Sequence, residues 1–97
     1  TDVRIGRRTQ IAGHCTINAS EHRYLGAEPI TEQGYDYAPV RIGEDVWVGA
    51  STVITHGTTL GAGVVIGAGS VVRGEIPPYA VAIGRPARVV RFRGTGT

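Results

Sequence analysis

Aliphatic residues recur every six positions along the middle of the chain. They are Ile42, Val48, Ile54, Leu60, Ile66 and Val72. A helix needs apolar residues every three or four positions, and a half-buried strand needs strict alternation, so a period of six matches neither. The period predicts short strands joined by tight turns, in which each six-residue unit, or hexad, forms one side of a coil.

Two further positions of the hexad support this interpretation. The second residue is glycine in four of the units, which suits a tight turn because glycine has no side chain to clash. The fifth residue is always small or β-branched, and these residues are Val46, Thr52, Thr58, Val64 and Ser70. Three hexads make one triangular turn of about eighteen residues. The spacing therefore predicts two coils, over residues 42–59 and 60–77.

The same period is present near the start of the chain and predicts an earlier coil over residues 5–22. If the coils stay in phase, three sets of residues stack on the three sides: Ile5 with Ile42 and Leu60, Ile11 with Val48 and Ile66, and Ile17 with Ile54 and Val72. Cys15 takes the small inward position that Thr9 fills one hexad earlier. Since a buried free cysteine behaves as a small hydrophobe, we expect it in the core.

Residues 23–40 break the period. They contain Pro29, Pro39 and three of the four tyrosines, which is too irregular for a coil and too aromatic for a flexible linker. The repeat then resumes at Ile42 in register. The interruption predicts a loop that protrudes from one corner, and such loops on rigid scaffolds commonly carry function.

The two ends of the repeat differ. Pro77 and Pro78 remove backbone donors, so we expect them to end the last coil. The C-terminal extension over residues 78–97 is predicted to return as a strand, a turn at 84–86 and a short apolar segment. The first hexad starts with an open coil edge, which predicts upstream coils in a longer chain or cover from another subunit. Residues 1–97 thus form a single all-β domain of about three coils.

Composition and charge restrict the function. All ten basic residues are arginine and no acidic residue follows Glu75, so the arginines near the C-terminus indicate either a solvated surface or a phosphate site. Nucleic acid is not an expected partner, since no basic helix or aromatic stacking pattern accompanies the arginines. The single cysteine excludes an internal disulfide framework and is compatible with the cytoplasm. The sequence shows neither a signal peptide nor a long apolar run, so membrane insertion is not expected.

Three blocks of sequence resemble the hexapeptide-repeat acyltransferases, in particular the branch of maltose and galactoside O-acetyltransferases. The blocks are IGEDVWVGA at 42–50, IGAGSVV at 66–72 and the ending PPYA at 77–80 with GRPARVV at 84–90. The resemblance implies a left-handed parallel β-helix that assembles as a homotrimer, with active sites in clefts between subunits. It also implies direct transfer of an acetyl group from acetyl-coenzyme A to a hydroxyl or amine of a small acceptor, such as a sugar, without a metal.

The resemblance also assigns catalytic roles. His22, at the junction where the loop leaves the coil, matches the family's general base, and a positioned base of this kind contributes roughly 10² to 10⁴ in rate. The backbone amide of Ala50 matches the donor that stabilises the oxyanion. Trp47, the single tryptophan, is placed in the wall of the active site beside the coenzyme.

The remaining assignments concern the two substrates. By resemblance Gly67 and Ala68 leave room for the pantetheine arm, and three arginines meet the coenzyme phosphates, namely Arg73, Arg85 and Arg88. Arg91 and Arg93 are expected to be solvated. The loop is expected to hold the acceptor through four side chains: Tyr24, Glu28, Tyr35 and Asp36.

Two other histidines and two other functions remain open. His14 falls at an outward corner and is expected to be solvated, and His56, which stands where relatives usually carry proline, is expected to form the turn. A γ-class carbonic anhydrase shares the fold and binds zinc through three histidines, but the spacing here does not match that ligand set. A non-catalytic trimeric scaffold, or a fragment of a larger transferase, is the other alternative.

Overall fold

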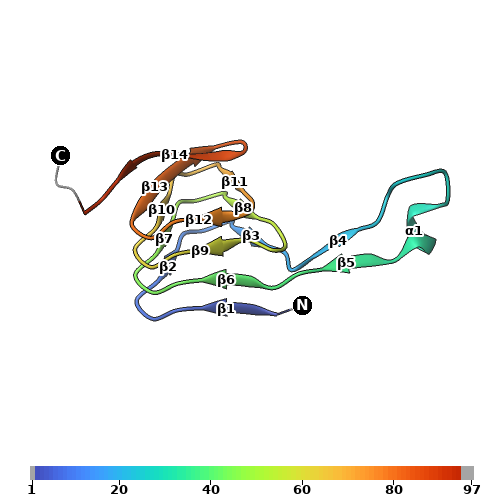
Figure 1. Ribbon diagram of the computed structural model, residues 1–97, viewed down its shortest axis with the longest axis horizontal. Coiled ribbons are helices and arrows are strands. Elements are labelled where there is room, and N and C mark those ends of the chain that lie inside the picture. The colour runs from blue at the N-terminus through green and yellow to red at the C-terminus, as the bar shows by residue number, and fades with distance from the viewer. Residues whose placement is uncertain (1, 95–97) are drawn as a thin grey trace.

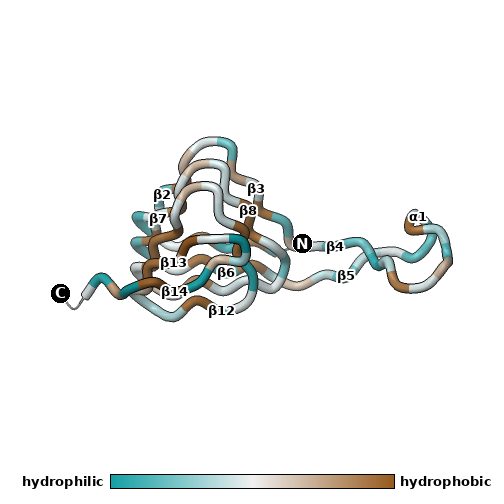
Figure 2. Tube along the Cα trace, turned by 90° about the horizontal axis from the view of Figure 1, so that it is seen from above, coloured by the Kyte–Doolittle hydropathy of each residue, from teal (hydrophilic) through white to brown (hydrophobic). Residues whose placement is uncertain are grey.

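The computed structural model describes residues 2–94 as a three-sided parallel β-helix from which one hairpin projects (Figure 1). The view along the coil axis shows the triangular outline of the stacked coils, with the hairpin leaving one corner (Figure 2). Each side of the triangle is a ladder of short strands, because tight corners leave room for only two or three residues of strand per side.

The strands of each side follow the hexad period. The first side contains β1 (Val3–Ile5), β6 (Val40–Ile42), β9 (Thr59–Leu60) and β12 (Glu75–Ile76). The second contains β2 (Gln10–Ile11), β7 (Trp47–Val48), β10 (Val65–Ile66), β13 (Ala80–Gly84) and β14 (Ala87–Phe92). The third contains β3 (Thr16–Ile17), β8 (Val53–Ile54) and β11 (Val71–Val72). All the pairs are parallel except that of β13 with β14.

The three predicted stacks are confirmed by the strand register. Ile42 pairs with both Ile5 and Leu60, Val48 pairs with Ile11 and Ile66, and Ile54 pairs with Ile17 and Val72. The fifth hexad residues also point inward and are buried, from Val46 to Ser70. Buried hydroxyl groups at this position need a partner. Thr58, for example, donates to the carbonyl oxygen of Val72 at 3.2 Å.

The fourth residue of the hexad turns each corner in the left-handed conformation. It has φ between +57° and +76° in all the coils, at Arg8, His14, Asp45, Ser51, Gly57, Gly63, Gly69 and Tyr79. Non-glycine residues adopt this conformation at a cost of roughly 1–2 kcal/mol each. The corner geometry therefore overrides the residue preference in every coil, which explains why glycine is common but not obligatory at this position.

The prediction that the double proline ends the last coil is wrong. The chain continues through Pro77 and Pro78 into β13, whose Ala82 pairs with Ile66 in the parallel ladder. Pro77 lies just beyond β12, the last strand of the first side, where its missing N–H would have had no strand above to bond. Tyr79 still donates to the carbonyl oxygen of Ala62 at 2.8 Å. Residues 76–81 are therefore another hexad.

The coil ends with β14, which folds back antiparallel onto β13 through a turn at 84–87. A return strand over Ala80 to Arg93 was expected, and it covers the top of the second side. At the opposite end, no strand among residues 2–94 pairs with the outer edge of the first coil. Ile5 is consequently 48% exposed, and Cys15 is only partly buried against the core rather than enclosed by it.

Residues 20–37 form the projecting hairpin. It consists of β4 (Ser20–His22) and β5 (Tyr35–Tyr37), which pair antiparallel, and a short α1 (Ile30–Gln33) near its tip. The hairpin extends from the corner between the third and first sides (Figures 1 and 2). Its exposed apolar side chains include Leu25, which is 82% exposed.

Replacing Gly74 with alanine isolates the cost of the left-handed corner. Gly74 has φ of +74° and no atom within 4 Å of the added Cβ, so the only penalty is conformational. We expect the free energy of unfolding to fall by about 1–2 kcal/mol, measured by chemical denaturation at fixed protein concentration. Gly13→Ala, also in open space but without a positive φ, is the control and should be neutral or slightly stabilising. Equal effects of the two changes would contradict this account.

Candidate active site

His22 lies at the end of β4, where the hairpin leaves the coil. Its ring lies 4.4 Å from the ring of Tyr35, which is the directly opposite residue on β5. Alternation along a strand places Glu21 on the other side of the hairpin from His22. The His22 side chain is exposed, so the imidazole is free to meet a molecule that enters from solvent.

Several of the residues predicted to bind the acceptor gather near His22. Tyr24 and Asp36 line one pocket with His22 on the hairpin. The Asp36 carboxylate accepts a hydrogen bond from Nε of Arg23 at 2.9 Å. Glu28 lies apart from this pocket, toward the tip, where its backbone carbonyl accepts a hydrogen bond from Gln33. The hairpin thus brings His22, Tyr24, Tyr35 and Asp36 together, and leaves Glu28 at a distance.

The second group of predicted residues lies at the corner between the second and third sides. Ala50 and Ala68 are exposed and occupy the third hexad position of successive coils. The N–H of Ala50 donates to no acceptor within residues 2–94. Gly67 has a packing role, because a Cβ there would lie 2.7 Å from Cδ1 of Ile83. This corner therefore presents a free backbone donor beside small side chains.

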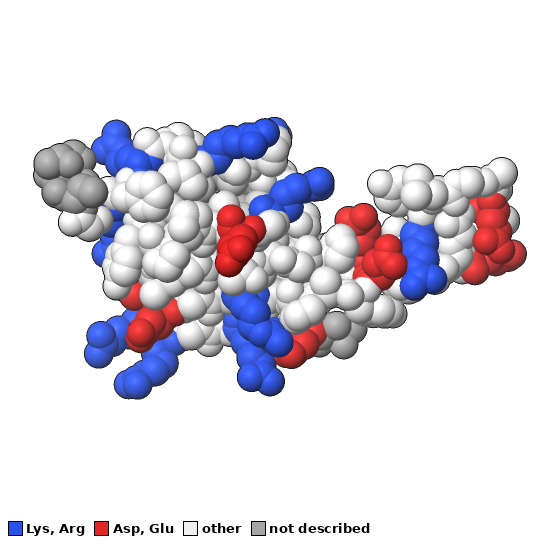
Figure 3. Space-filling view, viewed as in Figure 1, with Lys and Arg blue, Asp and Glu red and all other residues white. Residues whose placement is uncertain are grey.

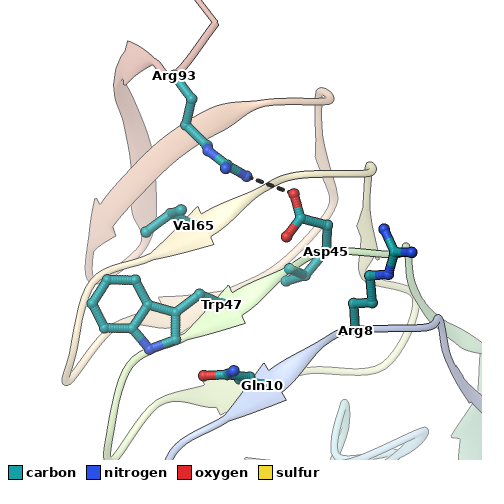
Figure 4. Close-up of a pocket in the computed structure, with 7 residues that line it drawn as sticks. Arg8, Gln10, Asp45, Trp47, Val65 and Arg93 are labelled. Atoms are coloured by element: carbon teal, nitrogen blue, oxygen red, sulfur yellow. Dashed lines mark hydrogen bonds and ion pairs between the residues drawn. The ribbon is translucent and has the colours of Figure 1, made fainter.

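Trp47 projects from the second side and is 56% exposed. In the ladder it lies between Gln10 below and Val65 above (Figure 4). These residues line a pocket with Arg8, Asp45 and Arg93. The pocket combines an aromatic face with two guanidinium groups, one of which is bonded to Asp45 (Figure 4).

The arginines predicted to meet phosphate lie near the top of the third side. Arg73 and Arg85 line one pocket with Pro86, and the Arg85–Pro86 peptide bond is cis. Nε of Arg85 donates to the carbonyl oxygen of Gly69 at 2.8 Å. This bond holds the guanidinium at the corner between the second and third sides. Arg73 forms no ion pair with any residue between 2 and 94. Arg88 is exposed on β14 and does not line the pocket.

His22 and Ala50 lie at different corners of the triangle. His22 belongs to the hairpin between the third and first sides, whereas Ala50 follows β7 at the corner between the second and third sides. One chain therefore does not bring the predicted base and the predicted oxyanion donor together. It presents two separate groups of residues, which we call the hairpin group (His22, Tyr24, Tyr35, Asp36) and the corner group (Trp47, Ala50, Gly67, Ala68).

The structure adds residues that the sequence did not single out. Arg93, expected to be solvated, donates to Asp45 and to the carbonyl oxygen of Gly63, and lies 5.8 Å from the Tyr79 ring centre. His56 lines a pocket at the base of the hairpin with Glu21. No feature of the sequence identified Glu21, because a single glutamate beside a histidine belongs to no repeat and to no recognisable motif.

Metal-binding groups and membrane-spanning helices are both absent from the described residues. Within residues 2–94, no group of three or more histidine, cysteine, aspartate or glutamate side chains is arranged to hold a metal ion. In the same range, no helix has the length and the apolar character needed to cross a membrane.

The comparisons with known proteins agree on one family. The family described as bacterial transferase hexapeptide (six repeats) matches residues 39–74. A probable acetyltransferase of Mycobacterium tuberculosis is 44% identical over 93 residues, which are 95% of this chain and 31% of that protein. The crystal structure of a maltose O-acetyltransferase from Clostridium difficile superposes with a TM-score of 0.85 at 40% identity, over 93% of this chain and 48% of that one.

A third comparison concerns a hexapeptide-repeat acetyltransferase of Vibrio cholerae, whose crystal structure is a complex with acetyl-coenzyme A. It has a TM-score of 0.76 at 27% identity, over 93% of this chain and 60% of that one. The chain thus spans between about a third and three-fifths of the length of these three proteins. Through residues 39–74 it belongs to the hexapeptide-repeat transferase family, and its fold is the left-handed parallel β-helix that the family resemblance implied.

Removing the Arg93 side chain should loosen the top of the coil. Arg93→Ala breaks the bonds to Asp45 and Gly63, and because the ion pair is partly exposed we expect a loss of only about 1 kcal/mol in unfolding free energy. Arg91→Ala, an exposed arginine on β14 two positions earlier, should change the unfolding free energy little. Chemical denaturation of both variants measures the difference. If the two variants are equally stable, the Arg93 contacts do not hold the C-terminal strand.

Proposed function

We propose that this chain is the coil and hairpin portion of an acetyltransferase that moves an acetyl group from acetyl-coenzyme A to a hydroxyl or amine of a small acceptor. The observation that carries the proposal is the place of His22, an exposed imidazole at the root of a projecting hairpin on a hexapeptide-repeat coil. The relatives named as acetyltransferases support the same class of reaction.

His22 acts as the general base. An alcohol is a weak nucleophile until its proton is removed, and imidazole is suited to take that proton near neutral pH. The acceptor oxygen then forms a bond to the thioester carbonyl carbon, and the bond from that carbon to sulfur breaks. The proton held by His22 passes to the leaving thiolate, which restores the neutral imidazole. The ring of Tyr35 supports the imidazole on one face.

The corner group leaves space for the thioester and stabilises the negative charge that develops on its carbonyl oxygen. Negative charge develops on the carbonyl oxygen during attack, and a backbone donor already aimed at that oxygen lowers the barrier. The unbonded N–H of Ala50 is the proposed donor. The pocket of Arg73 and Arg85 suits the coenzyme phosphates, because Arg73 lacks an anionic partner within the described range. Arg88 is an additional phosphate contact in this proposal, and Trp47 lines the thioester end.

A sugar is the proposed acceptor class. The hairpin group offers the Asp36 carboxylate and the Tyr24 phenol within one pocket, and both are suitable partners for sugar hydroxyls. Glu28 is retained as an acceptor residue for a longer ligand only, since it lies toward the hairpin tip. The solved maltose O-acetyltransferase supports the sugar class through its 40% identity with this chain.

The active site is completed between subunits of a homotrimer. The hairpin group and the corner group occupy different corners of one chain, so a threefold assembly allows the hairpin of one subunit to reach the coil of the next. Charge supports this docking, because residues 20–38 hold four acidic residues and one arginine, whereas the other nine arginines lie outside the hairpin. Figure 3 shows acidic side chains along the hairpin and basic ones around the coil. A cytoplasmic location belongs to the same proposal.

Substituting His22 should remove turnover and leave coenzyme binding intact. We expect His22→Ala to lower the rate of thiol release by roughly 10² to 10⁴, since the base is lost, while calorimetry finds unchanged affinity for acetyl-coenzyme A. His14→Ala, an exposed corner histidine, is the matched control and should retain full activity. A panel of sugars and amines supplies the acceptor. Binding without turnover in the wild type would favour a scaffold, and absence of binding would remove the coenzyme assignment.

Mixing two inactive variants tests the shared site. Ala50→Trp fills the corner, and His22→Ala removes the base. If each site takes one group from each of two neighbours, random mixed trimers should recover roughly a quarter of wild-type turnover. The measurement is thiol release after the two variants are unfolded together and refolded. If the mixture is as inactive as each variant alone, the hairpin group and the corner group of one active site come from the same subunit.

A further inference from the structure

His56 lies on the next coil at the same corner from which the hairpin projects, between β8 and β9. It occupies the third hexad position after β8, and its side chain is 26% exposed. Its Nδ1 atom is buried and has no hydrogen-bond partner. The nearest complementary group is the carboxylate of Glu21, whose Oε1 lies 3.6 Å from Nδ1. A small rotation of the Glu21 side chain brings this pair within hydrogen-bond distance.

The pair of Glu21 and His56 is the only polar side-chain contact between the hairpin strands and the coil in residues 2–94. The other hydrogen bond that joins the hairpin base to this corner is a backbone bond from Gly57 to Ala38 at 3.3 Å. The hairpin otherwise projects away from the coil (Figure 1). Its angle to the coil therefore depends on few contacts.

Glu21 immediately precedes His22 on β4. Strand alternation directs the two side chains to different faces of the hairpin, and both residues line the pocket at its base together with His56. A tether on Glu21 therefore fixes the strand that carries His22. Arg73 and Tyr24 line the same pocket as the pair. The pocket thus lies on the side of the hairpin base that faces the coil.

We propose that His56 is a positioning residue, which holds Glu21 through Nδ1 and so sets the place of the His22 imidazole relative to the rest of the active site. This inference rests on the proposed role of His22. Misplacing a reacting group by about 1 Å costs roughly 10²-fold in rate. The pair acts on the orientation of the base and not on coenzyme binding.

The test compares His56→Ala with His56→Asn, because the Asn amide nitrogen takes the place of Nδ1 and donates to Glu21. In His56→Ala we expect lower heteronuclear NOE values in β4 and β5, shifted ring resonances of His22, and a kcat for thiol release that is roughly 10- to 100-fold lower with little change in the KM for acetyl-coenzyme A. His56→Asn should restore all three quantities. Glu21→Ala should behave as His56→Ala does.

The outcomes separate this inference from the proposed function. Unchanged NOE values and His22 resonances in His56→Ala would overturn the tether, whatever the activity. Equal loss in His56→Ala and His56→Asn would show that the imidazole itself acts on a ligand, which also overturns it. Absence of thiol release by the wild type defeats the acetyltransferase proposal alone, since the NMR comparison decides the tether without turnover.

Discussion

The close approach of successive coils is the constraint on which the structure depends. Parallel strands in a ladder lie about 4.8 Å apart, and where the second hexad residue is glycine this leaves no space for a side chain. A Cβ on Gly49 would lie 2.5 Å from the backbone nitrogen of Ala68, and one on Gly6 would lie 2.6 Å from that of Glu44. The second position must therefore remain small after the strands of the first and second sides, whereas after the third side Asn18 and Thr55 occupy it beneath another coil. The fourth position then turns the corner in a left-handed conformation, and the first and fifth fill the interior.

These constraints explain why the fold was readable from the sequence. The six-residue period fixes the register, since any other pairing would place polar residues in the interior, and the predicted stacks follow directly from it. The six-residue period did not predict the hexad at 76–81, because the corner before it is shortened. Ile76 follows Val72 by four positions and not by six. Pro77 and Pro78 also led to the wrong prediction that the coil ends there. Their effect on a ladder depends on whether a strand lies above, which the sequence does not state.

The repeat pattern predicts less of the candidate site than of the fold. His22 and Ala50 are recognisable through a family resemblance, but their placement at separate corners follows from the coil geometry. The contact of Glu21 with His56 joins residues 35 positions apart and has no periodic signature. Arg93 shows the same limitation, because its partners Asp45 and Gly63 lie on two lower coils. Side-chain contacts between a regular coil and an irregular segment are set by three-dimensional packing alone.

This division between regular and irregular parts bears on how such a protein gains specificity. The coil repeats one interaction many times, so its surface offers similar corners, and the third hexad position leaves its N–H unbonded at Ala68 as well as at Ala50. A free amide at a corner therefore does not by itself distinguish a catalytic site. The hairpin breaks the symmetry, because it supplies an imidazole at a single corner. In the proposed acetyltransferase, a hairpin held at a defined angle would distinguish one of several similar corners as the active site, and few contacts are available to hold it.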